Sequence, residues 1–373
     1  MNKQHHVLCV VGTRPEAIKM APVIRALRES SWARCTVIAT AQQRGLLDQA
    51  LERFGIVPDI DLDIMTEGQS LASLTARLTP VLSEVISAQQ PDIVLAQGDT
   101  ATVFITALVS FYARIPFGHI EAGLRTYNLD QPYPEEAFRQ MVGRIACWHF
   151  APTATAAANL RREGISERCI FITGNTGIDT LLQVATACVP IATKSERMIL
   201  LTVHRRENFG EPLLEIFAAV RALVERYPDV RVVYPIHPNP NIKTAAYALL
   251  GGHERIDLRM PLDYFEFVEL MSSSYLILTD SGGIQEEAPA LAKPVLVLRQ
   301  QTERPEAVEF GVARLIGTDQ SDIFAAASEL LDDTNAYSKM AQRVSPYGDG
   351  HASERIVELL RKSVLEPGTV DAP

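Results

Sequence analysis

Three acidic side chains in the first half of the chain are candidates for proton transfer at a carbon atom. Asp99, Glu121 and Glu135 lie in the segments QGDT, HIEAGLRT and PYPEEAFR. Each follows an expected strand or opens an expected helix, so we expect all three at one edge of a parallel sheet. Paired carboxylates suit proton transfer when desolvation separates their pKa values. The alternative is that Asp99 and Glu135 only cap helices, but three acids at corresponding positions favour a catalytic site.

Two cations follow the first expected strand. The segment GTRPEAIK (12–19) supplies Arg14 and Lys19 near the start of a helix. The chain has 35 Lys and Arg residues against 45 Asp and Glu residues, a net charge of −10, so a phosphate site has to be formed locally. We therefore interpret these cations as contacts to a diphosphate. The alternative is that they are surface cations paired with Glu16 or Glu29.

A glycine turn late in the chain has the features of a phosphate and ribose site. In TDSGGIQEE (279–287), an apolar run leads into Gly282 and Gly283 and then into a helix. The glycines allow the backbone to approach a phosphate, and the N–H groups of the helix start favour an anion. Glu287 is placed to accept hydrogen bonds from both ribose hydroxyls. The alternative is an ordinary strand-to-helix turn with solvated glutamates.

Histidine and arginine residues follow other strands in the second half. His204, in HRREN, comes directly after a strand, where it can donate to a diphosphate oxygen as negative charge builds. His237 is a second candidate, and Arg304 is placed to reach the nucleotide or to close a cleft. No cluster of His, Cys and carboxylate residues has the spacing of a metal site, so we expect no metal.

Short β-branched runs alternate with longer amphipathic segments, which predicts doubly wound parallel α/β structure. The runs form two series, separated by an expected helix and linker over residues 181–197. We expect Rossmann-like domains over residues 1–180 and 198–350, and a region over 351–373 whose helix packs back on the first domain before a frayed tail. The expected strands cover residues 7–11, 36–40, 93–96, 117–120 and 147–151, and then 198–203, 230–235, 256–258, 275–279, 294–298 and 313–316.

The composition disfavours several classes of protein. The negative net charge argues against nucleic acid or an anionic membrane as the main partner. The 21 glycines include no GxGxxG fingerprint and no GxxxxGK[ST] loop, so bound NAD and ATP hydrolysis are disfavoured and no cofactor is expected. Five widely separated cysteines indicate reduced thiols. We therefore expect a soluble, cytoplasmic protein with a sugar nucleotide bound between two domains.

Seven segments, taken in order, closely resemble the non-hydrolysing UDP-N-acetylglucosamine 2-epimerases of bacteria. The resemblance covers nearly the whole chain. It implies two Rossmann-like domains of the glycosyltransferase B type with an interdomain cleft, usually in a homodimer. It also implies interconversion of UDP-N-acetylglucosamine and UDP-N-acetylmannosamine, which supplies precursors for surface polysaccharide. The segments are GTRPEAIK (12–19), QGDT (97–100), HIEAGLRT (119–126), PEEAFR (134–139), HRREN (204–208), TDSGGIQEEA (279–288) and TERPEA (302–307).

The resemblance also implies roles by position. Asp99, Glu121 and Glu135 match catalytic carboxylates, and His204 matches a catalytic residue at the diphosphate. The positions that match substrate-binding residues are Arg14, Lys19, Arg139, Phe267, Ser281, Gly282, Gly283, Glu287 and Arg304.

Two departures from the family pattern bear on regulation and specificity. The family usually has histidine where Gln43 follows Gln42, near an implied regulatory site for a second UDP-N-acetylglucosamine. Phe138 stands where asparagine is usual beside Glu135, which bears on the pocket around the sugar. The other positions that match the regulatory site are Arg77, Arg205 and His237.

The chemistry of the substrate predicts an elimination. The hydrogen on C2 is not beside a carbonyl group, and oxidation at C3 would need a nicotinamide cofactor. We therefore expect one carboxylate to remove the C2 proton as UDP leaves C1, followed by re-addition of UDP with protonation on the other face. The alternatives are an epimerase of a modified UDP-sugar, a hydrolysing epimerase, a glycosyltransferase of the same fold, and a sugar-nucleotide sensor without turnover.

Overall fold

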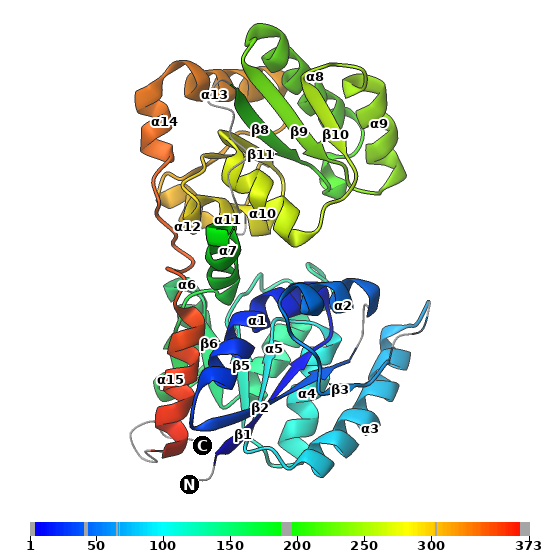
Figure 1. Ribbon diagram of the computed structural model, residues 1–373, viewed down its shortest axis with the longest axis vertical. Helices are drawn as coiled ribbons and strands as arrows, with labels where there is room; N and C mark the ends of the chain where they lie inside the picture. Colours follow the sequence, from blue (N-terminus) through cyan, green and yellow to red (C-terminus); the bar gives the residue numbers. More distant parts are fainter. Residues whose placement is uncertain are drawn as a thin grey trace. The chain divides into compact units, whose positions relative to one another are not determined.

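The computed structural model describes residues 4–40, 44–64, 66, 68–187, 196–302 and 304–365. The chain divides into two compact units (Figure 1). The first unit is Met1–Thr180 with Tyr347–Pro373, and the second is Leu181–Pro346. The chain therefore leaves the first unit after Thr180 and re-enters it at Tyr347.

The first unit contains a seven-stranded parallel sheet. The central strands β1, β4, β5 and β6 are buried on both faces, as expected for parallel strands covered by helices. The direction of winding reverses between β1 and β4, and doubly wound sheets bind ligands outside the carboxyl ends of their strands at this position. In spatial order the strands are β3 (Ile60–Asp61), β2 (Ala33–Ala39), β1 (His5–Val11), β4 (Ile93–Gln97), β5 (Phe117–Ile120), β6 (Trp148–Ala151) and β7 (Ile170–Ile172).

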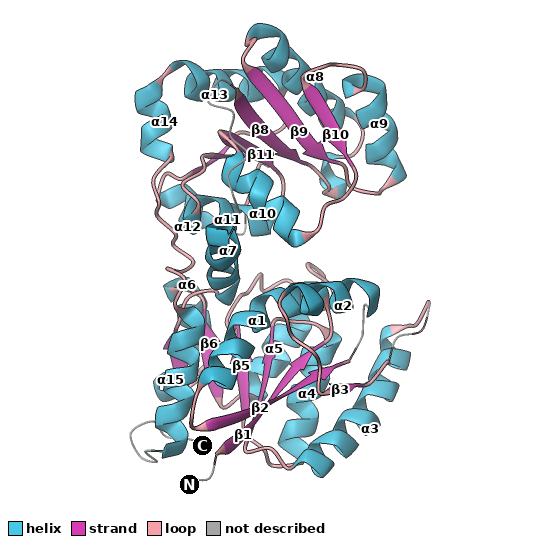
Figure 2. Cartoon of the chain, viewed as in Figure 1, coloured by secondary structure: helices cyan, strands magenta, loops and turns pink. Residues whose placement is uncertain are grey.

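Helices cover both faces of this sheet (Figure 2). Alternate residues of β1 enter different cores, because successive side chains of a strand point to opposite faces. Val7 packs with Met20 and Leu360 on one face, whereas Leu8 packs with Leu78 on the other. The helices are α1 (Arg14–Glu29), α2 (Arg44–Arg53), α3 (Leu71–Gln89), α4 (Ala101–Tyr112), α5 (Glu135–Ile145), α6 (Ala154–Arg162), η1 (Glu167–Cys169), α15 (Ala352–Leu365) and α7 (Thr176–Ala187), which continues into the second unit.

The second unit contains a six-stranded parallel sheet with the same kind of winding. Its core joins β8, β9 and β11 to α8 and α13 through buried side chains such as Leu201, Phe217, Tyr234 and Leu330. In spatial order the strands are β10 (Ile256–Arg259), β9 (Val230–Pro235), β8 (Arg197–Thr202), β11 (Leu276–Thr279), β12 (Val295–Val297) and β13 (Ala313–Leu315). The helices are η2 (Arg206–Asn208), α8 (Glu211–Arg226), α9 (Pro240–Leu250), α10 (Tyr264–Ser273), α11 (Gly282–Ala290), α12 (Pro305–Glu309), α13 (Gln320–Asp332) and α14 (Thr334–Met340).

The predicted doubly wound α/β fold is confirmed, and every strand predicted from an apolar run is present. Two edge strands, β3 and β7, were not predicted. They are two and three residues long, which is too short for a periodic pattern to stand out. The predicted linker and tail fall largely on residues 188–195 and 366–373, which lie outside the described residues.

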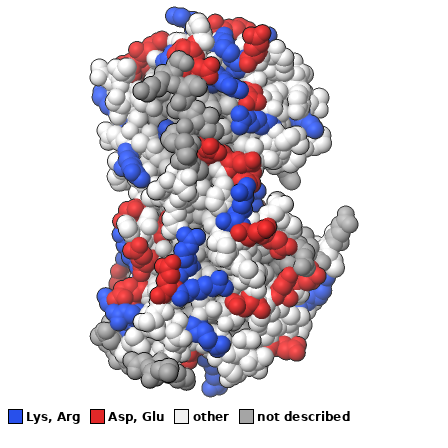
Figure 3. Space-filling view, in the orientation of Figure 1, with Lys and Arg blue, Asp and Glu red and all other residues white. Residues whose placement is uncertain are grey.

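Acidic and basic side chains are interspersed on the face drawn in Figure 3. Within the described parts of the chain, no helix is long and apolar enough to cross a membrane.

Candidate functional site

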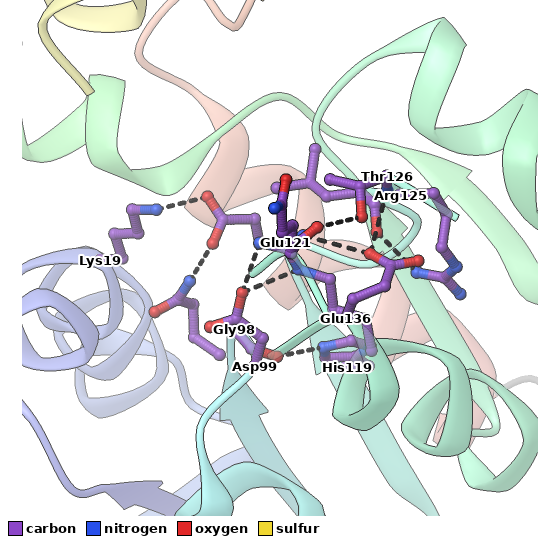
Figure 4. Close-up of polar contacts among 12 residues, drawn as sticks. Lys19, Gly98, Asp99, His119, Glu121, Arg125, Thr126 and Glu136 are labelled. Carbon is purple, nitrogen blue, oxygen red and sulfur yellow. Dashed lines mark hydrogen bonds and ion pairs between the residues drawn. The ribbon is translucent and has the colours of Figure 1, made fainter. Parts of the chain in front are cut away.

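The three predicted carboxylates occupy the ends of neighbouring elements in the first unit. Asp99 follows β4 through Gly98, whose φ of +93° is in the region that favours glycine. Glu121 comes directly after β5, and Glu135 is the first residue of α5. Strands β4 and β5 are paired neighbours, so Asp99 and Glu121 emerge side by side (Figure 4).

Asp99 does not cap the helix that follows it, so the capping alternative is wrong for Asp99, whereas Glu135 is an acid in the first turn of α5. The cap of α4 is Thr100, whose side chain accepts a hydrogen bond from the Val103 N–H. Helix α5 follows Pro134 and has no side-chain cap hydrogen bond. Both carboxylates are therefore available for other contacts.

Glu121 accepts donors on both carboxylate oxygens. Lys19 from α1 forms an ion pair with Oε1, and the side-chain amide of Gln97 donates to Oε2 (Figure 4). Asn175 Nδ2 also lies 3.2 Å from Oε1. Lys19 thus pairs with a predicted catalytic residue.

Asp99 forms an ion pair with Arg139. The Nε and Nη2 atoms of Arg139 lie 2.8 and 2.7 Å from Asp99 Oδ2, and its Nη1 lies 3.4 Å from Glu136. Arg139 was predicted to bind substrate. In this structure it fixes Asp99 between β4 and α5.

Glu136 is a structural acid that the sequence interpretation missed. Its buried carboxylate accepts the backbone N–H groups of Thr126 and Tyr127 and the amide of Gln140. Burial acts to raise the pKa of Glu136, but these hydrogen bonds and Arg139 outweigh it and leave the pKa below its ordinary value. Glu136 therefore anchors the loop that follows Glu121. In the sequence, the only indication of this role was that Glu136 is a second acidic residue at the start of a helix.

Two charged residues of the predicted site have side chains that are partly exposed and form no hydrogen bond or ion pair with the described part of the chain. They are Arg14 at the start of α1 and Glu135 at the start of α5. A cation and a carboxylate at the carboxyl edge of the sheet therefore have hydrogen-bonding capacity for a ligand.

A buried carboxylate joins the loop of Arg14 to the loop of Asp99. Glu16 accepts the Gly12 N–H at 2.6 Å and the Thr13 N–H at 3.3 Å, and Thr100 Oγ1 donates to its other oxygen at 2.6 Å. Burial raises the pKa of Glu16 to about 7, although the hydrogen bonds oppose the shift. The sequence signal was the spacing of Thr13 and Glu16, which form a capping box.

His119 also shapes the turn that carries Asp99. Its buried ring has Nε2 2.7 Å from the Gly98 carbonyl oxygen, so this nitrogen carries the hydrogen and donates it. Burial lowers the pKa of His119 to about 4, which keeps the ring neutral at physiological pH.

In the second unit, the buried side chain of Asp280 organises the loop after β8. Its carboxylate accepts the N–H groups of His204 and Arg205 at 3.0 and 2.9 Å and the Asn208 amide at 3.0 Å. His204 Nδ1 lies 3.3 Å from the same carboxylate, and its ring centroid is 5.8 Å from that of His237. Burial lowers the pKa of His204 against the opposing effect of Asp280. Asp280 is a further residue that the sequence interpretation missed.

Two arginines lie beside the predicted phosphate turn. A Cβ atom at Gly282, the first residue of α11, would lie 3.6 Å from Arg205 Nη2 and 3.8 Å from Arg304 Cζ. Arg304 also forms an ion pair with Glu286. Cations beside a helix start add to its preference for an anion.

The other predicted nucleotide contacts belong to the same unit. Ser281 precedes α11 and makes no side-chain cap hydrogen bond, and Gly283 has open space where a Cβ atom would be. Glu287 lies 3.5 Å from the Tyr264 hydroxyl, and Phe267 is partly exposed on α10.

The implied regulatory residues are divided between the units. Arg77 belongs to the first unit, where it donates to the Ile64 carbonyl at 3.3 Å and to Gln69 at 2.9 Å. Arg205 and His237 belong to the second unit. Gln42 and Gln43 lie outside the described residues, so regulation stays a prediction.

Phe138 stacks on Phe104 of α4, with ring centroids 5.2 Å apart and planes 10° apart. It packs against the core on the α3 and α4 face of the sheet. The expected influence of Phe138 on the sugar pocket would therefore act through the position of α5.

Among the described residues, no group of three His, Cys, Asp or Glu side chains is arranged to hold a metal ion. The site in the first unit is instead a set of carboxylates with basic and amide partners. Such a set is suited to moving protons and stabilising charge on an organic ligand.

Comparison with known proteins identifies the family. Residues 25–361 match the family described as UDP-N-acetylglucosamine 2-epimerase. The Escherichia coli K12 UDP-N-acetylglucosamine 2-epimerase is 48% identical over 370 residues, which cover 96% of this chain and 98% of that protein.

Two crystal structures have the same fold over nearly the whole chain. One from Listeria monocytogenes has a TM-score of 0.92 at 47% identity and covers all of both chains. The Neisseria meningitidis UDP-GlcNAc 2-epimerase bound to UDP-GlcNAc has a TM-score of 0.86 at 46% identity, over 96% of this chain and 100% of that one. The chain therefore belongs to the UDP-N-acetylglucosamine 2-epimerase family of isomerases.

Proposed function

We propose that this protein interconverts UDP-N-acetylglucosamine and UDP-N-acetylmannosamine by eliminating UDP and adding it back. The observation that carries the proposal is the carboxylate set at the edge of the first sheet. Asp99 pairs with Arg139, Glu121 pairs with Lys19, and Glu135 has no partner in the described part of the chain. The relationship to an enzyme crystallised with UDP-GlcNAc supports the choice of substrate.

The proposed reaction has two halves. In the first, a carboxylate takes the C2 proton, the C2–H bonding pair becomes the second bond between C1 and C2 of a 2-acetamidoglucal, and the C1–O pair leaves with UDP. In the second, UDP attacks C1 while a carboxylic acid returns a proton to the opposite face of C2. No oxidant or reductant is consumed, and no nicotinamide is needed.

The departing UDP carries the charge that has to be stabilised. Arg14 and Lys19 are the proposed contacts from the first unit, and His204 and Arg304 are those from the second. Fixed donors aimed at developing charge are often the largest contribution to catalysis. The Gly282 turn and Glu287 would hold the nucleotide.

The test is proton NMR of the purified protein with UDP-GlcNAc in deuterated water and no added cofactor. We expect UDP-ManNAc with deuterium at C2 and little free UDP. Stoichiometric free ManNAc and UDP would instead identify a hydrolysing epimerase. An unchanged spectrum despite binding would indicate a sensor or a different UDP-sugar as substrate.

Three further expectations extend the proposal. We expect a homodimer in the cytoplasm, whose product is used for surface polysaccharide. Analytical ultracentrifugation tests the first expectation, and the composition of the polysaccharide in a deletion strain tests the last.

A further inference from the structure

We propose that Asn175 is a positioning residue that holds the carboxylate of Glu121 in place and ties it to the C-terminal segment that re-enters the first unit. The importance of Asn175 for catalysis rests on the proposed function. The contacts that support it all lie within the first unit. Asn175 stands immediately before α7, outside the motifs that pointed to the site.

Glu121 needs donors to fix its side chain. Its φ is +66°, a left-handed conformation that is uncommon for residues other than glycine. Donors from other segments of the first unit hold the carboxylate in this position. Lys19 and Asn175 contact Oε1, while Gln97 contacts Oε2.

The amide of Asn175 has one possible orientation. Its Oδ1 accepts the Gly177 N–H at 2.9 Å, which leaves Nδ2 to face Glu121 at 3.2 Å. The residue is 4% exposed, and its own backbone N–H donates to the Tyr347 carbonyl at 2.6 Å. If the side-chain amide were flipped, its NH₂ group would face the Gly177 N–H and its oxygen would face the Glu121 carboxylate. The local backbone therefore fixes the orientation in which Asn175 donates to Glu121.

Asn175 lies in the segment through which the chain leaves the first unit. Residues on both sides of Asn175 contact the segment after Tyr347, through which the chain returns. Before it, a Cβ atom on Gly174 would lie only 3.3 Å from the Cα atom of Gly348. After it, the buried carboxylate of Asp179 accepts the Ser353 N–H at 2.7 Å at the start of α15. Asn175 therefore cannot shift unless both segments shift.

Asn175 and Lys19 have different roles at Glu121. Lys19 has a flexible side chain that is 25% exposed, and the proposed reaction requires it to contact UDP as well. When Lys19 turns toward a phosphate, Asn175 and Gln97 still hold the carboxylate. A shift of about 1 Å in a reacting group can cost about 100-fold in rate.

The first experiment compares two substitutions. Asn175→Asp keeps an oxygen for the Gly177 N–H but places a carboxylate beside Glu121, whereas Asn175→Ala removes both contacts. We expect kcat to fall about 10-fold in Asn175→Ala and about 100-fold in Asn175→Asp, with KM within about 3-fold. A purely structural role predicts the reverse order, because Asn175→Asp keeps the contact with Gly177, and that order would overturn the proposal.

Folding and nucleotide binding are the controls. Circular dichroism gives the folded fraction of each variant, and UDP affinity should be unchanged, because Asn175 is not among the proposed contacts to UDP. Asn335→Ala, an exposed position on α14, is the matched asparagine substitution and should leave kcat unchanged. Loss of activity only in proportion to the unfolded fraction would contradict a positioning role.

The second experiment does not depend on turnover. The side-chain amide resonance of Asn175, identified by its loss in Asn175→Ala, is followed by ¹⁵N TROSY NMR without substrate. We expect it to move in Glu121→Gln, because its acceptor changes from a carboxylate to an amide. A resonance that stays in place would overturn the proposal. Absence of epimerisation by the wild-type protein would refute the proposed function but leave this readout intact.

Discussion

Replacing Glu16 by glutamine should change how the stability of the first unit depends on pH. Glu16 is fully buried, and its pKa rises from an ordinary 4.5 to about 7. At about 1.4 kcal/mol per pH unit, the difference corresponds to about 3 kcal/mol. The glutamine side chain can imitate protonated Glu16 by accepting from Gly12 and Thr13 and donating to Thr100.

The sign of the effect follows from the order in which the two states lose their proton. Below pH 4.5 the carboxyl group is protonated in both states and has no influence on the pH dependence. Between pH 4.5 and 7 the unfolded chain ionises first, so the wild-type protein loses stability as the pH rises. Above pH 7 the full cost of about 3 kcal/mol is present. Glu16→Gln does not titrate and should avoid this loss.

The assay is guanidinium unfolding at several values between pH 4.5 and 8, followed by tryptophan fluorescence. Both tryptophans, Trp32 and Trp148, belong to the first unit, so the signal reports the unit that contains Glu16. We expect the free energy of unfolding of Glu16→Gln, relative to the wild type, to rise by about 3 kcal/mol over this range.

Glu136→Gln is the matched control. Glu136 is also a buried glutamate, but its pKa is lowered, so it contributes stability above pH 4.5 that is lost as the pH falls. The stability of Glu136→Gln relative to the wild type should therefore stay nearly constant between pH 4.5 and 8, and should change in the opposite direction only when the series is extended below pH 4.5. If Glu16→Gln differed from the wild type by the same amount at every pH, burial would not control the ionisation of Glu16 and our reasoning would be refuted.

Three other substitutions test the site. Asp99→Asn should abolish epimerisation in the deuterium-exchange assay but leave UDP binding largely intact, because Asp99 is a proposed catalytic carboxylate and not a proposed contact to UDP; near-normal turnover would remove Asp99 from the mechanism. Gly12→Ala should lower the free energy of unfolding by about 1–3 kcal/mol, because its Cβ would lie 2.4 Å from Thr102 Oγ1; an unchanged denaturation midpoint would contradict this. Asp280→Ala should destabilise the second unit by about 3 kcal/mol and weaken UDP binding by calorimetry, because the buried amide of Asn208 and the N–H group of His204 lose their acceptor; unchanged affinity would exclude Asp280 as the support of that loop.

The alternation of apolar runs with amphipathic segments was sufficient to predict the fold class. A parallel strand is buried on both faces, and this burial leaves a local signal in the sequence. The edge strands β3 and β7 were missed because they are only two and three residues long. Their pairing depends on the neighbouring strand rather than on their own pattern.

The candidate site was predictable in its positions but not in its contacts. Asp99 and Glu121 could be placed at one sheet edge because each follows a strand. Their partners could not be predicted. Lys19 is 102 residues from Glu121 along the chain, and Arg139 is 40 residues from Asp99. Such pairs form only when the sheet order brings their elements together.

The sequence by itself determined which residue types stand at the ends of strands, because strand periodicity and turn chemistry are local properties of the chain. Only the tertiary structure decided which of these residues are fixed by hydrogen bonds and ion pairs, and which residues are their partners. Glu16, Asn175 and Asp280 are buried polar side chains whose partners come from distant segments. Burial makes an unpaired polar group costly, so these contacts depend on how the elements pack rather than on any one of them alone.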